Sequence, residues 1–165
     1  MRITSATPGA APSIKAVART AWHATYDHII GEEAVDELVD NWYDVEDIRR
    51  SIERDISPMF IAIEQESTLG FAQGGPTDAG PADAVISRIY VHPDRWGERI
   101  GSRLLDRLCG TLADRGYEAV WLAVLAENEV GRRFYEAKGF EEVERQFTEL
   151  AGVEHEELLL TKHLE

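Results

Sequence analysis

The sequence contains a single cysteine, Cys109, among its 165 residues. One cysteine excludes an internal disulfide. Cys109 lies in a segment whose apolar residues recur at helical spacing, and a thiol in that setting is far more often a packing residue than a nucleophile. We therefore expect Cys109 to be structural.

Long hydrophobic runs are also missing. No stretch reaches about eighteen apolar residues, the length typical of a membrane span, and the N-terminal residues 1–9 lack the apolar centre of a signal peptide. Hydrophobic residues nevertheless make up 44% of the chain, which argues against disorder and suffices for one sizeable core. These features predict a soluble, cytoplasmic protein with a single domain over residues 1–165.

Positive charge is scarce. Acidic residues outnumber basic ones by 31 to 17, and the formal net charge is −14, which disfavours nucleic acid as a partner through repulsion. The acidic surface could keep the protein soluble in high salt, or it could attract a cationic amine. Because the acidic residues are spread along the chain, the first explanation is favoured. We hypothesise a halophilic source, which full stability and activity at low salt would contradict.

The periodicity of apolar residues places helices and strands along the chain. A first helix opens at Pro12, and a helical, acidic stretch covers residues 32–56. Residues 74–83 form a Gly/Pro-rich loop, and residues 140–161 form a closing hairpin. Further strands are expected at residues 2–5, 59–64, 68–73 and 85–91. The pattern predicts an α/β fold, with a mixed central sheet of about six or seven strands flanked by helices on both faces.

An anion-binding turn is predicted where the strand ending at Val91 leads into an amphipathic helix. The helix begins close to Arg99, so its unpaired N–H groups point back into the turn. Gly97 and Gly101 let the backbone approach a ligand closely, and the positive end of the helix dipole favours phosphate. Many strand-to-helix turns carry glycine and bind nothing, so this pattern alone leaves phosphate binding open.

A second informative segment runs from Asn128 to Phe140. It follows the apolar run of residues 119–125, which predicts a strand buried on both faces. Asn128 stands where a helix N-cap is expected, and Gly139 is a suitable C-cap. Tyr135 lies beside the apolar stripe of this short helix, so its hydroxyl could enter a cleft; amphipathic packing is the alternative. The stripe comprises Val130, Phe134 and Ala137.

Together the two segments resemble the GNAT superfamily of N-acetyltransferases. Residues 91–101 follow the family pattern Val-x-Pro-x-x-Arg-Gly-x-Gly-x-Gly in part. The second pattern, Asn-x-x-x-x-x-Phe-Tyr-x-x-x-Gly-Phe, is matched at every defined position and is more specific than a glycine pattern. Its residues here are Asn128, Phe134, Tyr135, Gly139 and Phe140.

The resemblance implies an enzyme that moves an acetyl group from acetyl-coenzyme A directly to a primary amine. Asn128 would contact the pantetheine arm or neighbouring backbone, and the Tyr135 hydroxyl would protonate the departing thiolate. The pantetheine would pair with the strand residues Ile89, Tyr90 and Val91. The pyrophosphate would lie on the turn and helix start, which here comprise Trp96, Gly97, Arg99, Gly101 and Ser102.

Three departures from the family pattern stand out. Trp96 replaces the usual Arg or Gln before the first glycine, and Arg99 replaces the middle glycine. The Arg99 side chain could turn outwards or contact a phosphate itself. Many family members also carry a Glu near the start of the strand ending at Val91, where this chain reads Ala84-Val-Ile-Ser-Arg88. No general base is therefore assigned.

The resemblance places the acceptor amine near Tyr26, Asp27 and the strand residue Arg88. His23 and His28 are five residues apart and do not share a helical face, so no metal site is expected. A homodimer would be usual for the family, but the sequence identifies no interface. Two alternatives to an enzyme acting on a small-molecule or protein amine remain open. They are a non-catalytic acyl-coenzyme A binding or sensing module and a nucleotide-binding α/β protein.

Overall fold

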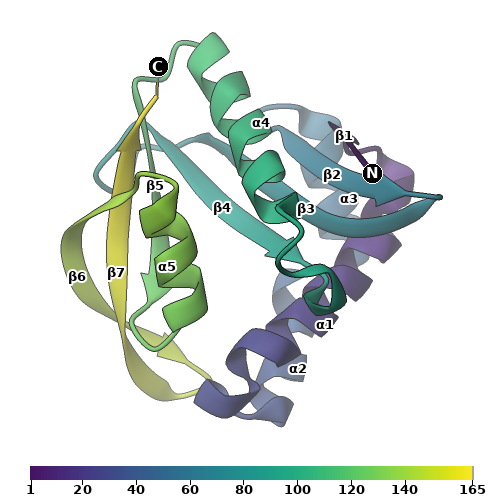
Figure 1. Ribbon diagram of the computed structural model, residues 1–165. Coiled ribbons are helices and arrows are strands. Elements are labelled where there is room, and N and C mark those ends of the chain that lie inside the picture. Colours follow the sequence, from purple (N-terminus) through teal and green to yellow (C-terminus); the bar gives the residue numbers. More distant parts are fainter. Residues whose placement is uncertain (165) are drawn as a thin grey trace.

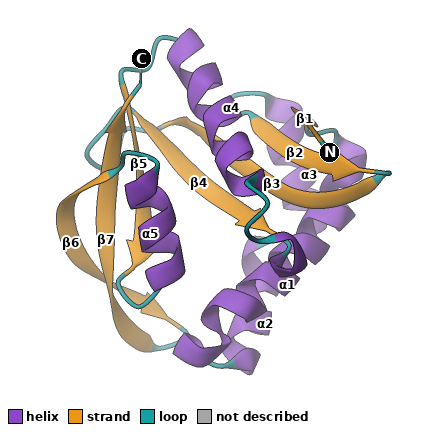
Figure 2. Cartoon of the chain, viewed as in Figure 1, coloured by secondary structure: helices purple, strands orange, loops and turns teal. Residues whose placement is uncertain are grey.

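The computed structural model describes residues 1–164 and contains a seven-stranded mixed sheet with helices on both faces (Figures 1 and 2). The strand order is β1-β2-β3-β4-β5-β7-β6. The strands are β1 (Arg2–Ser5), β2 (Met59–Glu64), β3 (Ser67–Pro76), β4 (Ala84–Val91), β5 (Ala119–Leu125), β6 (Glu141–Leu150) and β7 (Val153–His163). The helices are α1 (Ala11–Ile30), α2 (Glu32–Trp42), α3 (Val45–Arg54), α4 (Ile100–Asp114) and α5 (Glu129–Ala137), with short 3-10 turns at Pro8–Ala10 and Pro93–Arg95. The predicted fold class is confirmed.

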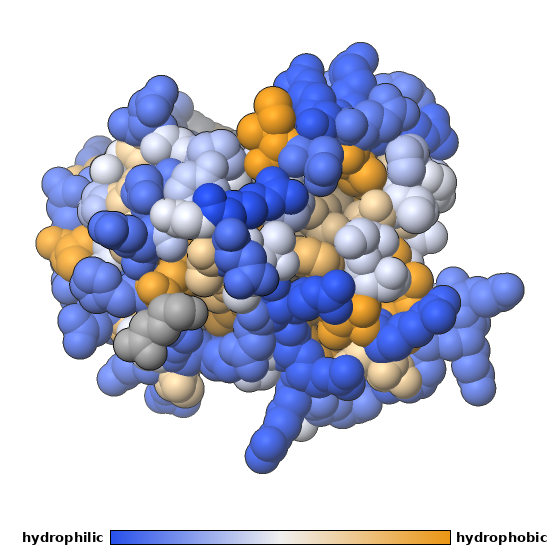
Figure 3. All heavy atoms as spheres, turned by 90° about the horizontal axis from the view of Figure 1, so that it is seen from above, coloured by the Kyte–Doolittle hydropathy of each residue, from blue (hydrophilic) through white to orange (hydrophobic). Residues whose placement is uncertain are grey.

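Two hydrophobic clusters cover the two faces of the sheet. On one face α4 buries the leucines predicted from their helical spacing, together with the structural thiol Cys109. On the other face α1, α2 and α3 pack through apolar residues that include Trp22, Val35 and Ile48. Within residues 1–164, none of the helices is both long and apolar enough to cross a membrane. The face in Figure 3 is mostly hydrophilic, as expected from the net charge of −14.

Strands β4 and β5 are paired only where they begin. Their parallel register comprises two residue pairs, Ala84 with Val120 and Val85 with Trp121. Beyond these pairs β5 is hydrogen-bonded to β7 along its whole length, while β4 follows β3. The β3–β4 register shifts after Gln73, which leaves Ser87 as an extra residue in β4. The sheet therefore divides between β4 and β5. The backbone of β4 borders the resulting gap on one side, and the helices α1, α4 and α5 surround it.

Two boundaries differ from the sequence prediction. The helical stretch predicted over residues 32–56 is two helices, because Asp44 leaves the helical conformation and accepts a bond from the Asp47 amide at 3.2 Å as the N-cap of α3. Residues 74–76, predicted as loop, extend β3. A Cβ atom at Gly74 would lie 2.6 Å from the Val85 carbonyl oxygen, so this glycine permits close strand contact instead of marking a turn.

One burial prediction is wrong. Strand β5 is not buried on both faces, since Ala123 is exposed in the gap. The apolar stripe of α5 is also partly open: Val130 is 65% exposed and α5 has no fully buried residue, although Phe134 packs against the core. Both segments border the gap between β4 and β5. Their apolar residues therefore line a cavity that a sequence pattern cannot distinguish from a packed interior.

Candidate active site

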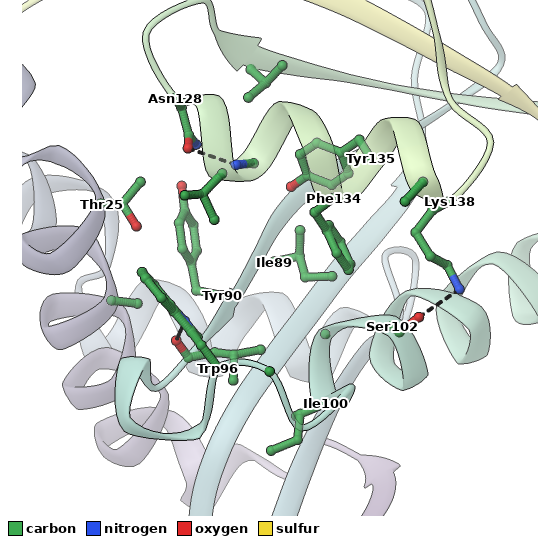
Figure 4. Close-up of a pocket in the computed structure, with 18 of the residues that line it drawn as sticks. Thr25, Ile89, Tyr90, Trp96, Ile100, Ser102, Asn128, Phe134, Tyr135 and Lys138 are labelled. Atoms are coloured by element: carbon green, nitrogen blue, oxygen red, sulfur yellow. Dashed lines mark hydrogen bonds between the residues drawn. The ribbon is translucent and has the colours of Figure 1, made fainter.

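A cavity of about 460 Å³ occupies the gap between β4 and β5 (Figure 4). Its wall is formed by the second half of β4, the turn and first residues of α4, the exposed face of α5 and one side of α1. Every residue predicted to bind the cofactor lies in this wall, as do Tyr26 and Tyr135. The fold thus brings the two sequence segments to one site.

The β4 side of the cavity presents free backbone groups. The His92 amide donates to the Leu69 carbonyl of β3 at 2.7 Å, so the alternation of a strand directs the backbone groups of Val91, and of Ile89 two residues earlier, to the opposite side. That side is the gap, where β5 has diverged. One of these groups has a side-chain partner, since the Trp96 indole Nε1 donates to the Val91 carbonyl oxygen at 2.9 Å.

The start of α4 provides a second set of backbone donors. The first internal bond of the helix runs from the Arg103 amide to the Arg99 carbonyl at 3.1 Å, so the amides of residues 100–102 have no partner within the helix. Arg99 precedes the helix with φ of 64°, and Gly97 has φ of 87°. These left-handed residues turn the chain back over the cavity, and the helix dipole makes this end attractive to an anion.

The charged side chains that line the cavity are all basic, although the whole chain is strongly acidic. They are Arg95, Arg99 and Lys138, and no aspartate or glutamate is found among the described lining residues. Arg95 is held by Glu64 at 3.1 Å and by Glu98 at 2.8 Å. The exposed Arg99 side chain makes no hydrogen bond or ion pair with the part of the chain that is described. Its guanidinium is therefore available to a ligand.

Lys138 was not identified from the sequence. Its ammonium group donates to Ser102 Oγ at 2.9 Å and lies 2.6 Å from Asp106, so it joins the end of α5 to the first turns of α4 (Figure 4). A lysine after a helix of this kind carries no distinctive signal in the sequence. Its position beside the α4 amides depends on how the two helices pack.

Helix α5 supplies the polar groups on the far side of the cavity. Asn128 is its N-cap, as predicted, and Oδ1 accepts a bond from the Gly131 amide at 2.9 Å. Tyr135 lies two turns later, and its hydroxyl is directed into the cavity towards Ile89 and Tyr90 (Figure 4). Burial raises the pKa of Tyr135 above its ordinary value, so the hydroxyl keeps its proton at neutral pH.

A model of the acetyltransferase (GNAT) family matches residues 19–140. The chain belongs to this family. Acetyl-coenzyme A is the acetyl donor typical of GNAT proteins. The matched residues include the later part of α1, strands β2 to β5 and the helices α4 and α5 that border the cavity.

Two curated relatives of this GNAT chain act on different amines. The spermidine N(1)-acetyltransferase of Thermoplasma acidophilum is 29% identical over 128 residues, which is 75% of this chain and 78% of that protein. The ribosomal protein bS18-alanine N-acetyltransferase of Escherichia coli strain K12 is 37% identical over 60 residues. That second match spans 36% of this chain and only 40% of the length of the E. coli enzyme.

Solved structures share the whole GNAT fold at lower identity. The PaiA N-acetyltransferase of Thermoplasma acidophilum, crystallised in complex with coenzyme A, has a TM-score of 0.83 and 22% identity, covering 99% of both chains. The ribosomal-protein-S18-alanine N-acetyltransferase of Escherichia coli has a TM-score of 0.74 and 19% identity over 99% of this chain and 94% of that one. The likeness concerns the fold.

On the α1 side of the cavity, this GNAT chain has a cluster of aromatic residues. The hydroxyls of Tyr26 and Tyr90 are 3.0 Å apart, and burial raises the pKa of both groups. Trp22 packs against both rings and is 6% exposed, so it belongs to the core. Thr25 also lines the cavity and was missed, since a single threonine on a helix gives no signal.

Asp27 and Arg88 lie outside the cavity wall. Asp27 Oδ1 is 2.7 Å from Nδ1 of His23. The Arg88 guanidinium stacks over the Tyr43 ring, with its carbon 5.0 Å from the ring centre, and donates to the Trp42 carbonyl at 3.4 Å. Arg88 therefore faces the α1–α3 side of the sheet. Both residues are engaged by neighbours within the fold.

Proposed function

We propose that the protein is an acetyl-coenzyme A-dependent N-acetyltransferase acting on a primary amine. The observation that carries this proposal is the meeting of three features at one cavity. The free edge of β4, the unpaired amides that begin α4 and the inward hydroxyl of Tyr135 all border the same space. Packing of the hydrophobic core does not require these three polar features to border one cavity.

The described residues fit coenzyme A in chemistry and shape. The amides of Gly101 and Ser102, with those of the preceding turn from Gly97, would hold the pyrophosphate, and Arg99 is free to add its charge. The exposed backbone of Ile89 and Val91 would pair with the amide groups of the pantetheine arm. Bound there, the cofactor supplies an acetyl thioester, an acyl group already activated towards an amine.

Tyr135 is proposed as the general acid. Its hydroxyl is protonated at neutral pH because burial raises its pKa, and it points across the gap towards the β4 edge. A phenol at that place can give its proton to the thiolate that leaves when the carbon–sulfur bond breaks. Asn128 shapes the same wall through its bond to the Gly131 amide.

The acceptor is proposed to enter from the α1 side, past Thr25 and Tyr26. Asp27 and Arg88 would then not contact the acceptor directly, since neither borders the cavity. The relatives suggest two classes of acceptor, a polyamine and a protein N-terminal amine. The net charge of −14 would attract a cationic amine from a distance, but the spread of the acidic residues along the chain favours a halophilic source as its explanation.

The test combines cofactor binding with turnover. Acetyl-coenzyme A should raise the melting temperature more than ATP or NAD does, and thiol release should occur with at least one of spermidine, lysine or an alanyl peptide. The change Tyr135→Phe should leave coenzyme A binding intact and lower kcat by about 10²-fold or more. Cofactor binding without thiol release from any amine would identify a non-catalytic acyl-coenzyme A module. Unchanged kcat in Tyr135→Phe would reject the role of the phenol.

A further inference from the structure

His155 on β7 is a buried polar residue that the proposed reaction has not yet used. The residue is 8% exposed, and its Nδ1 lies 3.0 Å from Oε1 of Glu127. Its other ring nitrogen, Nε2, is buried without a hydrogen-bond partner within residues 1–164. Buried polar atoms in proteins are nearly always hydrogen-bonded, so the open Nε2 offers a position for a further hydrogen-bond partner, either a water or a bound group.

The contact with Glu127 determines which nitrogen is open. A carboxylate only accepts hydrogen bonds, so Nδ1 of a neutral His155 carries the proton and Nε2 carries the lone pair. Nε2 is therefore an acceptor and a base. A histidine oriented in this way by a carboxylate is the arrangement that proteins use to remove a proton from a nucleophile.

The strand register places His155 on the acceptor side of the sheet. Glu157 of β7 pairs with Leu125 of β5, and residues two apart on a strand share a face, so His155 lies on the same face as Leu125. Leu125 belongs to the same hydrophobic cluster as Trp22 and Tyr26 of α1. His155 therefore belongs to the α1 side of the sheet, from which the acceptor is proposed to enter.

The carboxylate that holds His155 is next to the cavity. Glu127 immediately precedes Asn128, which lines the cavity wall. The turn that carries Glu127 is fixed to β7, because the Ala126 amide donates to the Glu156 carbonyl at 2.9 Å. The pair thus lies at the junction of β5, β7 and α5, behind the residues that line the cavity, so that a proton from a bound amine would reach Nε2 through one bridging water.

We propose that His155, oriented by Glu127, accepts the proton of the acceptor ammonium group. This inference rests on the proposed function and supplies the general base that β4 lacks. Proton transfer to Nε2 leaves a neutral amine, whose nitrogen forms a bond to the acetyl carbon. As the carbon–sulfur bond breaks, the thiolate takes the proton of Tyr135, and the phenolate regains one from the positively charged nitrogen of the new amide. The net proton released stays on His155 until solvent removes it.

The test compares the pH dependence of kcat/KM for the wild type, His155→Gln and Glu127→Gln, with acetyl-coenzyme A and the best amine of the panel above. His163→Gln is the matched control, because His163 lies on the same strand but is exposed at its far end. The ionisable groups near His155 are Glu127, which contacts it, and Glu157 on the same face of β7; Tyr26 of α1 belongs to the cluster that contains Leu125. The α2 residues of the neighbouring cluster are apolar.

At neutral pH His155→Gln should lower kcat/KM by about 10²-fold, and Glu127→Gln by about tenfold, with the Kd for coenzyme A unchanged. The deficit should shrink as the pH rises towards the pKa of the free amine, because a neutral amine needs no base. A deficit that is equal at every pH, or a loss below threefold in both variants, would overturn the proposal. If His155→Gln does not fold, Glu127→Gln decides, since Glu127 is exposed. A wild type that acetylates no amine would contradict the proposed function itself.

Discussion

The Trp96 indole is hydrogen-bonded to the Val91 carbonyl, a backbone group with which the cofactor is proposed to pair. Its Nε1 donates to the Val91 carbonyl oxygen at 2.9 Å, and this carbonyl faces the gap between β4 and β5. If the pantetheine arm pairs with Val91, the indole must release it first. The indole bond then competes with the cofactor, and removing that bond should strengthen binding.

The change Trp96→Phe keeps an aromatic ring but removes the donor. Trp96 is 44% exposed, so its hydrogen bond exchanges with water and contributes about 0.5–1 kcal/mol net. Since 1.4 kcal/mol corresponds to about tenfold, Trp96→Phe should bind coenzyme A about two- to fivefold more tightly than the wild type. Titration calorimetry with coenzyme A measures this difference without turnover.

The control for this change is Trp42→Phe, because Trp42 is similarly exposed, at 49%, but does not line the cavity. Its Kd should equal that of the wild type. Coenzyme A should also change the fluorescence of the wild type more than that of Trp96→Phe. An unchanged or weaker affinity of Trp96→Phe would refute the reasoning, because the indole would then not compete for Val91.

Two further predictions concern stability. Nδ1 and Nε2 of His23 lie 2.7 and 2.8 Å from the carboxylates of Asp27 and Asp36, so both nitrogens can donate only when the ring is charged. Burial, the largest single influence, lowers the pKa of His23, but the two carboxylates together raise it above its ordinary value of about 6.5. The wild type should therefore lose stability relative to His23→Gln as the pH rises from about 6.5 through the folded pKa. Separately, Asn128→Ala should lower the free energy of unfolding by about 1 kcal/mol, because the N-cap of α5 is lost.

Each of these predictions has a direct measurement. Urea unfolding of the wild type and His23→Gln at several pH values gives the first, and a difference that does not vary with pH would contradict it. For Asn128→Ala the matched control is Asp44→Ala, which removes the equivalent cap of α3 away from the cavity. Both cap variants should lose similar stability, but only Asn128→Ala should also lose activity. Equal activity in the two would show that Asn128 serves the helix alone.

Most secondary structure followed from the sequence because it depends on neighbouring residues. Helical spacing located α4, and capping residues located α5, since caps and periodicity act within a few positions of the chain. The helical stretch predicted over residues 32–56 is divided into α2 and α3 for an equally local reason, the capping geometry of Asp44. The misjudged burial of Ala123 had a different origin. An apolar residue that faces a cavity and one that faces the core have the same sequence signature.

The sequence alone determined the mixed α/β fold and the two motifs, because spacing and capping are encoded within short segments, and the resemblance of those motifs to the GNAT pattern made Tyr135 and Asn128 candidate site residues. Tertiary structure alone decided that β4 and β5 separate after two residue pairs, that Lys138 joins α5 to α4, and that Asp27 and Arg88 lie outside the cavity. It alone also placed His155 against Glu127, 28 residues earlier in the chain. Such contacts depend on strand order and helix packing, which bring together residues that have no relation in the sequence.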